Sequence, residues 1–294
     1  MRCARLLPWL LAAAAAAPGC GSHDALVASS SAAPSEREAH ELAVHDEPGP
    51  CTADIVLGPG LTHERRALAA KSPTGATPCL DVVRADLHQY RLRILTAARD
   101  GNGSHPAPWW RDAFHLVAVT NAGMFHEEGD PVGLVVEDGV ALGNDNKTFS
   151  GYLAFDETGA TITGRDCPGF DLAALRKRYR NVVQSGRLLG CDGKALPWKD
   201  KKQYSSAAIG VDREGQVVFL HARDAITMTE LAAAVAELDL QGALFLEGGP
   251  EASLVVRGPK GELARMGSYE TGFVENDGNQ SFWWLPNVIA LEAR

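Results

Sequence analysis

The sequence predicts an α/β (α+β) domain in which strands outnumber helices. Short apolar or alternating segments bounded by Gly, Asp and Asn recur between residues 82 and 246, which is the pattern of strands. A helical pattern near residue 229 runs directly into an apolar strand, and such a passage packs a helix on a sheet. Residues 51–294 are enough for one large domain with a sizeable core, and the chain has no internal repeat.

The expected elements follow one another along residues 82–246. Strands are expected where apolar and polar residues alternate or where apolar runs are short: 82–95, 115–120, 134–137, 151–155, 161–163, 207–212, 217–221 and 243–246. A short helical turn is expected at 108–114. Two further helices are expected, one at 171–179 with Asp171 as N-cap and one that the capping box of Thr227 and Glu230 opens.

The first residues read as an export signal rather than as part of the domain. Arg2 and Arg5 precede an apolar run at 6–17, which is too short for a comfortable membrane span and is typical of a signal peptide. No other segment is long and apolar enough to cross a bilayer. We therefore expect a signal peptide at 1–19 and an exported protein.

Cys20 is the expected attachment point of a lipid such as palmitate. The stretch Ala-Pro-Gly-Cys at 17–20 resembles the cleavage box of bacterial lipoproteins, although Pro18 is unusual there. An ordinary signal peptide cut nearby is the alternative. Residues 20–50 are rich in Ala, Ser, Glu, His and Pro and bury too little surface to fold, so they are expected to form a flexible tether. The predicted location is the bacterial cell envelope, in the periplasm or at the outer membrane, with a membrane contact through the lipid.

The formal net charge of −9 makes nucleic acid an unlikely partner. Basic residues cluster only at 176–180 and 199–202, and such short runs are usually solvated faces. Charge therefore excludes one class of function without selecting another.

Four cysteines remain after the signal and Cys20 are set aside, and an even number in an exported chain indicates two disulfides. Three connectivities are possible. Cys51–Cys79 and Cys167–Cys191 are favoured because each pairing closes a shorter loop. A zinc site is the competing interpretation, but none of the four forms a C-x-x-C pair.

Asn121, Gly123, Phe125 and His126 form the first of three polar segments that could carry chemistry, at the end of an apolar run. Gly123 allows a backbone geometry or a close ligand approach that other residues do not. Asn121 offers a donor and an acceptor for a sugar hydroxyl or a phosphate oxygen. His126 could transfer a proton or bind a metal. The structural alternative is a plain hairpin with an exposed histidine.

The second segment is the turn Ser185-Gly186-Arg187, which follows Gln184. Backbone N–H groups and a guanidinium at the end of a strand can hold an anion. A solvent-exposed turn is the alternative.

The third segment is Glu247-Gly248-Gly249, where an acid stands directly at the end of a buried strand. A buried carboxylate is costly without partners, and the two glycines leave room for a ligand beside it. The alternative is a carboxylate that accepts hydrogen bonds from loop N–H groups. The oxygen-rich run at 144–146 lacks the spacing of a calcium loop and is interpreted as a turn.

Taken in order, the blocks at 120–126, 131–139, 184–189, 207–212 and 243–249 resemble the phosphodiester glycosidase family over roughly residues 85–290. The likeness is to the bacterial exported branch of N-acetylglucosamine-1-phosphodiester α-N-acetylglucosaminidase-like domains. The resemblance implies a single α/β domain with mixed β-sheets flanked by helices, at 51–294. It implies hydrolysis of the bond between the anomeric carbon of a sugar and a phosphodiester.

By matching position, the resemblance carries substrate-binding roles to Asn121, Gly123, Phe125, Ser185 and Gly186, and it places Glu247, Gly248 and Gly249 where the family has Asp-Gly-Gly. Two departures stand out. The carboxylate is Glu247 rather than Asp, and no Arg precedes Ile209, where the family tends to have one.

The expected mechanism assigns the catalytic roles to Glu247 and His126. Glu247 would stabilise the oxocarbenium-like charge at C1 or activate water, and His126 would protonate or position water. Arg187, with the backbone N–H groups of the Ser-Gly and Gly-Gly turns, would neutralise the phosphate. We expect an exported hydrolase that acts on an envelope or extracellular glycan and needs no cofactor.

Two alternatives are kept. The first is a non-catalytic envelope lipoprotein that binds glycan or phosphoglycan in the same place, which both departures favour. The second is a metal-dependent hydrolase in which a divalent cation is held by Asn121, His126 and nearby acids.

Overall fold

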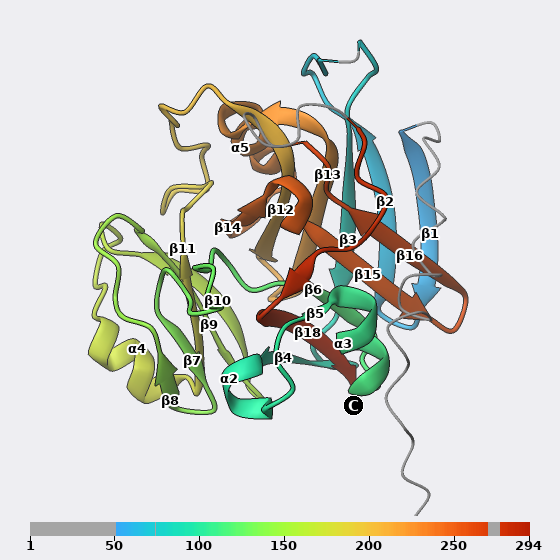
Figure 1. The fold of residues 1–294 in the computed structure, drawn as a ribbon. Coiled ribbons are helices and arrows are strands. Elements are labelled where there is room, and N and C mark those ends of the chain that lie inside the picture. The colour runs from blue at the N-terminus through green and yellow to red at the C-terminus, as the bar shows by residue number, and fades with distance from the viewer. Residues whose placement is uncertain (1–50, 74, 270–276) are drawn as a thin grey trace, which may run out of the picture. The chain divides into compact units, whose positions relative to one another are not determined.

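The computed structural model describes residues 51–73, 75–269 and 277–294. This part of the chain forms three antiparallel sheets and one short two-stranded ribbon, and short helices lie against them (Figure 1). The predicted signal peptide, the lipid site at Cys20 and the whole tether at 20–50 lie outside the described residues. No helix that is described is long and apolar enough to span a bilayer.

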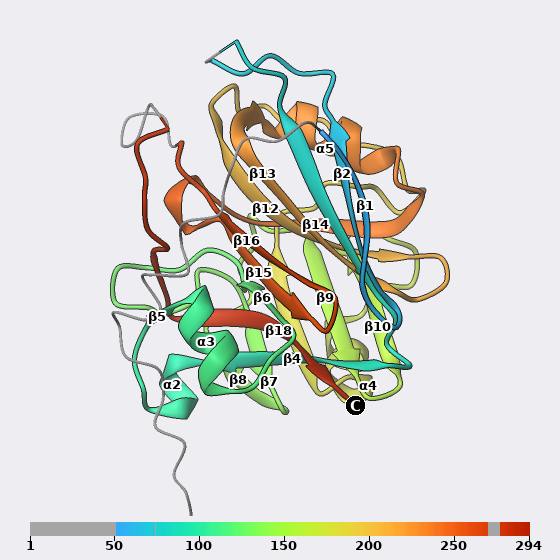
Figure 2. The same cartoon turned by 90° about the vertical axis from the view of Figure 1, so that its right-hand side faces the viewer.

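The largest sheet has six strands in the order β1-β2-β3-β13-β12-β14 and is called the β12 sheet here. Its strands are β1 (Thr52–Gly58), β2 (Leu61–Ala67), β3 (Cys79–Ala85), β13 (Val217–Thr227), β12 (Gln203–Asp212) and β14 (Leu240–Gly248). Helix α5 (Met228–Ala236) covers its outer face and joins β13 to β14 (Figure 2).

Two five-stranded sheets pack beside it. The β6 sheet contains β16 (Gly261–Met266), β15 (Ser253–Gly258), β6 (Ala118–Asn121), β18 (Asn287–Ala293) and β4 (Tyr90–Thr96). The β9 sheet contains β10 (Gly159–Gly164), β9 (Gly151–Asp156), β11 (Asn181–Ser185), β7 (Val135–Glu137) and β8 (Val140–Leu142). The ribbon pairs β5 (His105–Pro106) with β17 (Trp284–Leu285).

The helices are short and lie at the ends or outer faces of the sheets. They are α2 (Ala97–Asp100), α3 (Ala107–Ala113), α4 (Leu172–Arg178), α5 and the 3₁₀ turn η2 (Gly249–Glu251). Asp171 caps α4 by accepting from two backbone N–H groups, and the capping box of Thr227 and Glu230 opens α5, so both predicted caps are confirmed.

The main core lies where the inner faces of the three sheets meet. Val83 and Phe219 of the β12 sheet, Leu254 and Ile289 of the β6 sheet, and Leu153 of the β9 sheet are fully buried in one cluster. Removal of this much apolar surface from water is the main force that holds the sheets together. The meeting of the sheets places the ends of β6, β11 and β14 near one another.

The fold confirms the α+β class and the single domain, with strands far outnumbering helices. All strand pairs of the described residues are antiparallel. The sheets are mixed only in the sense that each combines strands from distant parts of the chain. The strand expected over 82–95 is two strands in different sheets. Asp86 breaks it, because its carboxylate accepts from the backbone N–H of His88 and forms a turn.

Both predicted disulfides are confirmed. Cys51–Cys79 joins the start of β1 to β3, and Cys167–Cys191 joins the loop after β10 to the loop after β11. Disulfides of this kind are typical of proteins exported to an oxidising compartment.

Candidate functional site

The three polar segments of the sequence converge in the fold. The side-chain oxygen of Asn121, at the end of β6, accepts from the backbone N–H of Ser253 at 3.3 Å, just after η2. The Gly186 carbonyl, after β11, accepts from the Phe245 N–H of β14 at 2.9 Å. The carbonyl of Leu134, at the end of the loop that follows Asn121, accepts from the Gln184 N–H of β11 at 2.8 Å. Each segment is thus tied to the others at the junction of the three sheets.

Three buried polar atoms at this junction have no hydrogen-bond partner among the described residues. They are the Asn121 Nδ2, the Ser185 Oγ and the Ser253 Oγ, and all three residues are fully buried. A buried donor without a partner costs free energy of about 1–3 kcal/mol. Such atoms are commonly satisfied by a water molecule or a ligand group, so the junction is chemically incomplete on its own.

The rest of the first segment shapes the loop after β6. Gly123 has a φ of +98°, a conformation that favours glycine, as the sequence predicts. Phe125 is half-buried against the cluster under α3, so its ring serves packing. His126 is exposed in a turn that its backbone forms with Gly129 and Asp130, and no hydrogen bond of its imidazole to a described residue is found.

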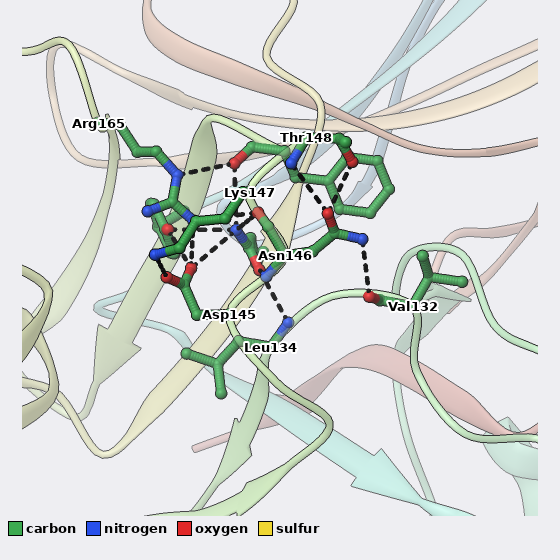
Figure 3. A network of polar contacts seen from close by, with 10 residues as sticks. Val132, Leu134, Asp145, Asn146, Lys147, Thr148 and Arg165 are labelled. Carbon is green, nitrogen blue, oxygen red and sulfur yellow. Dashed lines mark hydrogen bonds and ion pairs between the residues drawn. The ribbon is translucent and has the colours of Figure 1, made fainter.

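Gln184 explains how the second segment is held in place. Its side-chain oxygen accepts from the backbone N–H groups of Leu134 and Asn146, and its nitrogen donates to the Asn146 carbonyl at 2.7 Å. Figure 3 shows the loop it organises, in which Arg165 and Lys147 contact the carboxylate of Asp145. Burial opposes ionisation of Asp145, but the hydrogen bonds from these cations hold its pKa well below the usual range.

This network accounts for the oxygen-rich run at 144–146. The Asp145 carboxylate is shared by Arg165, Lys147 and the Tyr152 hydroxyl, which donates to it at 2.6 Å. An acid that is saturated with cations and donors has no room for a calcium ion. The run is a structural brace next to Ser185, in agreement with its interpretation as a turn.

Arg187 has a different surrounding from the one expected for a phosphate ligand. Its guanidinium is 3% exposed, forms an ion pair with Asp166 and donates toward the sulfurs of Cys167 and Cys191 at 3.1 and 3.3 Å. Its side chain runs past Gly151 and Gly164, where a Cβ would lie 2.4 Å from it. Its Nε is buried and has no hydrogen-bond partner among the described residues. Because the two terminal nitrogens are engaged by these contacts, we assign Arg187 a structural role and leave it out of the mechanism.

Glu247 lies at the end of β14 and is half-buried. Its Oε1 accepts from the Gly248 N–H at 3.1 Å, so that N–H serves the carboxylate in this structure. The ring of Tyr204 lies against Gly248, where an added Cβ would be 2.5 Å from it. Burial raises the pKa of the Tyr204 phenol, and the negative charges of Asp200 and Glu247 raise it further. The hydroxyl of Tyr204 therefore stays neutral.

Glu247 also belongs to a polar row that crosses the β12 sheet. In the strand register, Asp81 of β3 lies opposite His221 of β13, His221 opposite Ala207 of β12, and Ala207 opposite Glu247 of β14. Residues that lie opposite one another on adjacent strands point to the same face of a sheet. Asp81, His221 and Glu247 therefore share the inner face of the sheet, together with Arg65 of β2, which lies opposite Asp81.

Asp81 is the anionic centre of this row. It is 2% exposed, and its carboxylate binds His63 Nε2 at 2.7 Å and Arg265 Nε at 2.8 Å. Burial alone would favour the neutral acid. The hydrogen bond from His63 and the charge of Arg265 outweigh burial and hold the pKa of Asp81 well below the usual range.

His221 is fully buried and neutral at ordinary pH. Burial lowers its pKa to about 4, although Asp81 and the Ala252 carbonyl oppose the shift. The nitrogen Nε2 lies 3.1 Å from the Ala252 oxygen, so it carries the proton of the neutral ring. The nitrogen Nδ1 is then an acceptor, and it has no partner among the described residues.

The sequence reasoning missed Asp81, His221 and Arg265. A signal existed for two of them: Asp81 interrupts the apolar run Cys-Leu-Asp-Val-Val, and His221 ends the run Val-Val-Phe-Leu-His. A polar residue in a strand that is otherwise apolar is costly unless it has a partner or a function. Nothing in the sequence indicated that these two runs pair.

One group of potential metal ligands is found among the described residues, and it consists of Asp166, Cys167 and Cys191. The two sulfurs form a disulfide and Asp166 pairs with Arg187, so this group does not have the thiolates that a metal site needs. A surface hollow of about 450 Å³ is lined by residues such as Asp86, Arg178 and Gln216. None of the three polar segments contributes to it, so the chemistry of the junction, not cavity size, marks the site.

The chain belongs to the phosphodiester glycosidase family, whose model matches residues 114–292, more than half of the chain. The match contains all three polar segments and His221. Asp81 and His63 lie before its start, although the fold joins them to the same row.

Two solved structures share the fold. The zebrafish N-acetylglucosamine-1-phosphodiester α-N-acetylglucosaminidase catalytic domain, auto-inhibited by its pro-peptide, is 14% identical, with a TM-score of 0.60 over 83% of this chain and 87% of that one. A hypothetical protein from Synechocystis is 14% identical, with a TM-score of 0.64 over 84% of this chain and 64% of that one. No curated protein matches this sequence significantly.

Proposed function

We propose that the protein is an exported phosphodiester glycosidase, which hydrolyses the bond between the anomeric carbon of a sugar and its phosphodiester group. The observation that carries this proposal is the convergence of the three family segments on one junction, where buried polar atoms of Asn121, Ser185 and Ser253 lack partners among the described residues. Family membership supports the reaction type.

The proposed reaction breaks the bond between C1 and the phosphate oxygen. Water adds its oxygen to C1, the bonding electrons leave with the phosphodiester, and a free sugar and a phosphate monoester result. Glu247 stabilises the positive charge that develops on the ring or accepts the proton of the attacking water. The phosphate is a good leaving group, so it needs neutralisation of its charge more than a strong acid.

Arg223 is the proposed source of this neutralisation. Its side chain is 18% exposed, whereas those of Arg187 and Arg265 are 3% and 11% exposed and pair with Asp166 and Asp81. Arg223 itself pairs with the half-exposed Asp277 and donates to the Met266 carbonyl at 2.9 Å. Its charge lies near enough to His221 to lower the pKa of that ring, and His221 shares the row with Glu247.

Replacement of Glu247 tests the proposal. The full chain is incubated with methyl diesters of sugar 1-phosphates in ¹⁸O-water, and mass spectrometry determines which product has gained ¹⁸O. We expect ¹⁸O in the sugar, because water attacks C1. Glu247→Gln should lose at least about 100-fold in kcat, as removal of a transition-state contact typically does.

Glu157→Gln is the matched control, because Glu157 is an exposed acid that belongs to none of the three polar segments. It should keep full turnover. Full activity of Glu247→Gln would remove the carboxylate from the mechanism, and ¹⁸O in the phosphate would show attack at phosphorus instead. Loss of turnover on addition of a chelator would favour the metal-dependent alternative with His126.

A non-catalytic glycan-binding protein is the second candidate. The observation that favours it is the absence of an arginine just before Ile209, where the family tends to have one. A sugar-1-phosphodiester that binds the full chain and remains intact for days would support this candidate over the hydrolase.

We further propose that Cys20 carries a lipid that holds the protein at the cell envelope, with residues 20–50 as tether. The sequence of the cleavage box supports this, and the two disulfides agree with export. Cys20→Ser should move the protein from the membrane fraction to the soluble fraction and abolish labelling by a palmitate analogue. A protein that stays in the membrane fraction after this change would contradict the lipid anchor.

A further inference from the structure

A ladder of aromatic rings ends in an exposed tryptophan on the two-stranded ribbon. Trp109 of α3 stacks on His105 of β5, with ring centroids 3.6 Å apart and planes inclined by 16°. His105 stacks on Trp284 of β17 at 5.4 Å and 23°. Trp284 is 52% exposed, so its indole packs on His105 and presents much of its surface to solvent.

The surroundings of the ladder hold the Trp284 indole in a fixed orientation. Trp109 and Trp110 are buried, and the Trp110 Nε1 donates to the Leu285 carbonyl at 3.0 Å. Leu285 in turn pairs with His105 across the ribbon. A ring that is already oriented loses little conformational entropy when a ligand covers it.

The ribbon is bound to the first polar segment of the candidate site. Asn287, three residues after Trp284, accepts from the Ala122 N–H at 3.0 Å and donates to the Gly129 carbonyl at 3.3 Å. Three extended residues span about 10 Å. Trp284 and Asn121, which precedes Ala122, are therefore within the reach of a short oligosaccharide. Figure 2 shows β5 beside α3, near one end of β18.

We propose that Trp284 is a platform for a sugar ring in a neutral glycan chain of gluco configuration, whose sugar-1-phosphodiester end occupies the candidate site. Pyranose rings with equatorial substituents present C–H groups that pack on the face of an indole. Glu127, Glu128 and Asp130 are exposed on the loop that Asn287 holds, and their charges disfavour an anionic chain. The inference rests on the proposed function and names the class of its substrate.

Calorimetric titration of the full chain with chitotetraose and with cellotetraose tests the platform. We expect at least one of these probes to bind. Trp284→Ala should weaken that binding at least about tenfold, because buried aromatic contacts dominate most interfaces. Trp284→Phe should keep most of it, and Val140→Ala, which truncates another exposed apolar side chain, should leave it unchanged.

The same experiment separates the platform from the catalytic proposal. Glu247→Gln should bind the tetrasaccharide as the unmodified chain does, whether or not either turns over a phosphodiester. Absence of binding by both probes would overturn the platform, as would equal binding by Trp284→Ala with an unchanged thermal midpoint. Both outcomes would leave hydrolysis of a sugar-1-phosphodiester untouched.

Discussion

His221 shows how one buried side chain links the chemistry of the junction to its stability. The imidazole is neutral, donates through Nε2 to the Ala252 carbonyl and leaves Nδ1 as an acceptor. Ala252 precedes Ser253, whose N–H binds Asn121. The ring therefore positions the backbone that in turn positions Asn121, and protonation of Nδ1 would add a charge to an interior that already holds Arg265.

The pKa of His221 predicts how stability depends on pH. Between about pH 4 and 6.5 the unfolded histidine is protonated and the folded one is not, so the unfolded state binds more protons and stability falls as pH falls. The loss across this window is about 3 kcal/mol at most. Asp81, whose folded pKa is lowered from 3.8, adds a loss of the same sign that begins near the acid end of this window, where the unfolded carboxylate starts to protonate.

Urea unfolding at pH 5 and pH 7 checks this expectation. His221→Gln keeps a donor for the Ala252 carbonyl and removes the titrating ring, so it should unfold at nearly the same urea concentration at both pH values. A pH dependence in His221→Gln as large as in the unmodified chain would show that another group causes it.

At this scale the sequence could identify residues but not their neighbours. Asn121, Ser185 and Glu247 were predicted as site residues, and the structure brings their segments together. Arg187 was predicted to bind phosphate because it follows the Ser-Gly turn. Its guanidinium instead contacts Asp166 and the Cys167–Cys191 disulfide, and the position of these groups in the fold cannot be read from the turn itself. The importance of Asp81 and His221 depends on a pairing between strands more than 130 residues apart, which no local pattern encodes.

At the scale of elements, the turn after β11 is braced from two sides. Gln184 ties it to the loop at 145–149, and Arg187 ties it to the Cys167–Cys191 disulfide. Between these braces lie Ser185 and Gly186, the pair assigned to the substrate. The rigidity of this turn therefore comes from contacts outside the site.

Removal of the Cys167–Cys191 disulfide is expected to affect both stability and activity. The double change Cys167→Ser and Cys191→Ser should lower the free energy of unfolding by about 3 kcal/mol, as loss of a cross-link over a loop of this length does. It should also raise KM, because Arg187 loses its sulfur contacts next to Gly186. Urea unfolding and steady-state kinetics measure the two effects.

The Cys51–Cys79 disulfide is the matched control, since it closes a loop of similar length at the start of β1. Cys51→Ser with Cys79→Ser should lower stability by a similar amount and leave KM unchanged. Equal kinetic effects of both double changes would mean that Arg187 does not transmit the loss to the turn.

Local signals predicted elements well where the chain itself carries the determinant. The N-cap of Asp171 and the capping box of Thr227 and Glu230 need only neighbours three residues away, and both are present. The strand over 82–95 was predicted as one because its alternation continues through the turn at Asp86. The strands β15, β16 and β18 were not predicted, since their partners are set by the sheet order.

At the scale of the whole molecule, the site exists only because three sheets meet. The β6, β9 and β12 sheets contribute Asn121, Ser185 and Glu247 respectively, and no single sheet or helix holds more than one of them. The sequence predicted the class of the fold, and a family resemblance was needed to place the segments together. Periodicity reports which face of a strand is buried, not which strand lies beside it.

The path of Arg187 has a consequence for sequence variation. Gly151 and Gly164 lack side chains where Arg187 passes, and a methyl group at either would collide with it. At Gly151 an added Cβ would also lie 2.3 Å from Leu244, whereas at Gly164 the three nearest atoms all belong to Arg187. Positions 164 and 187 should therefore covary among relatives: where 187 is small, alanine or serine becomes permissible at 164. An alignment in which bulky residues at 164 coexist with arginine at 187 would contradict this coupling.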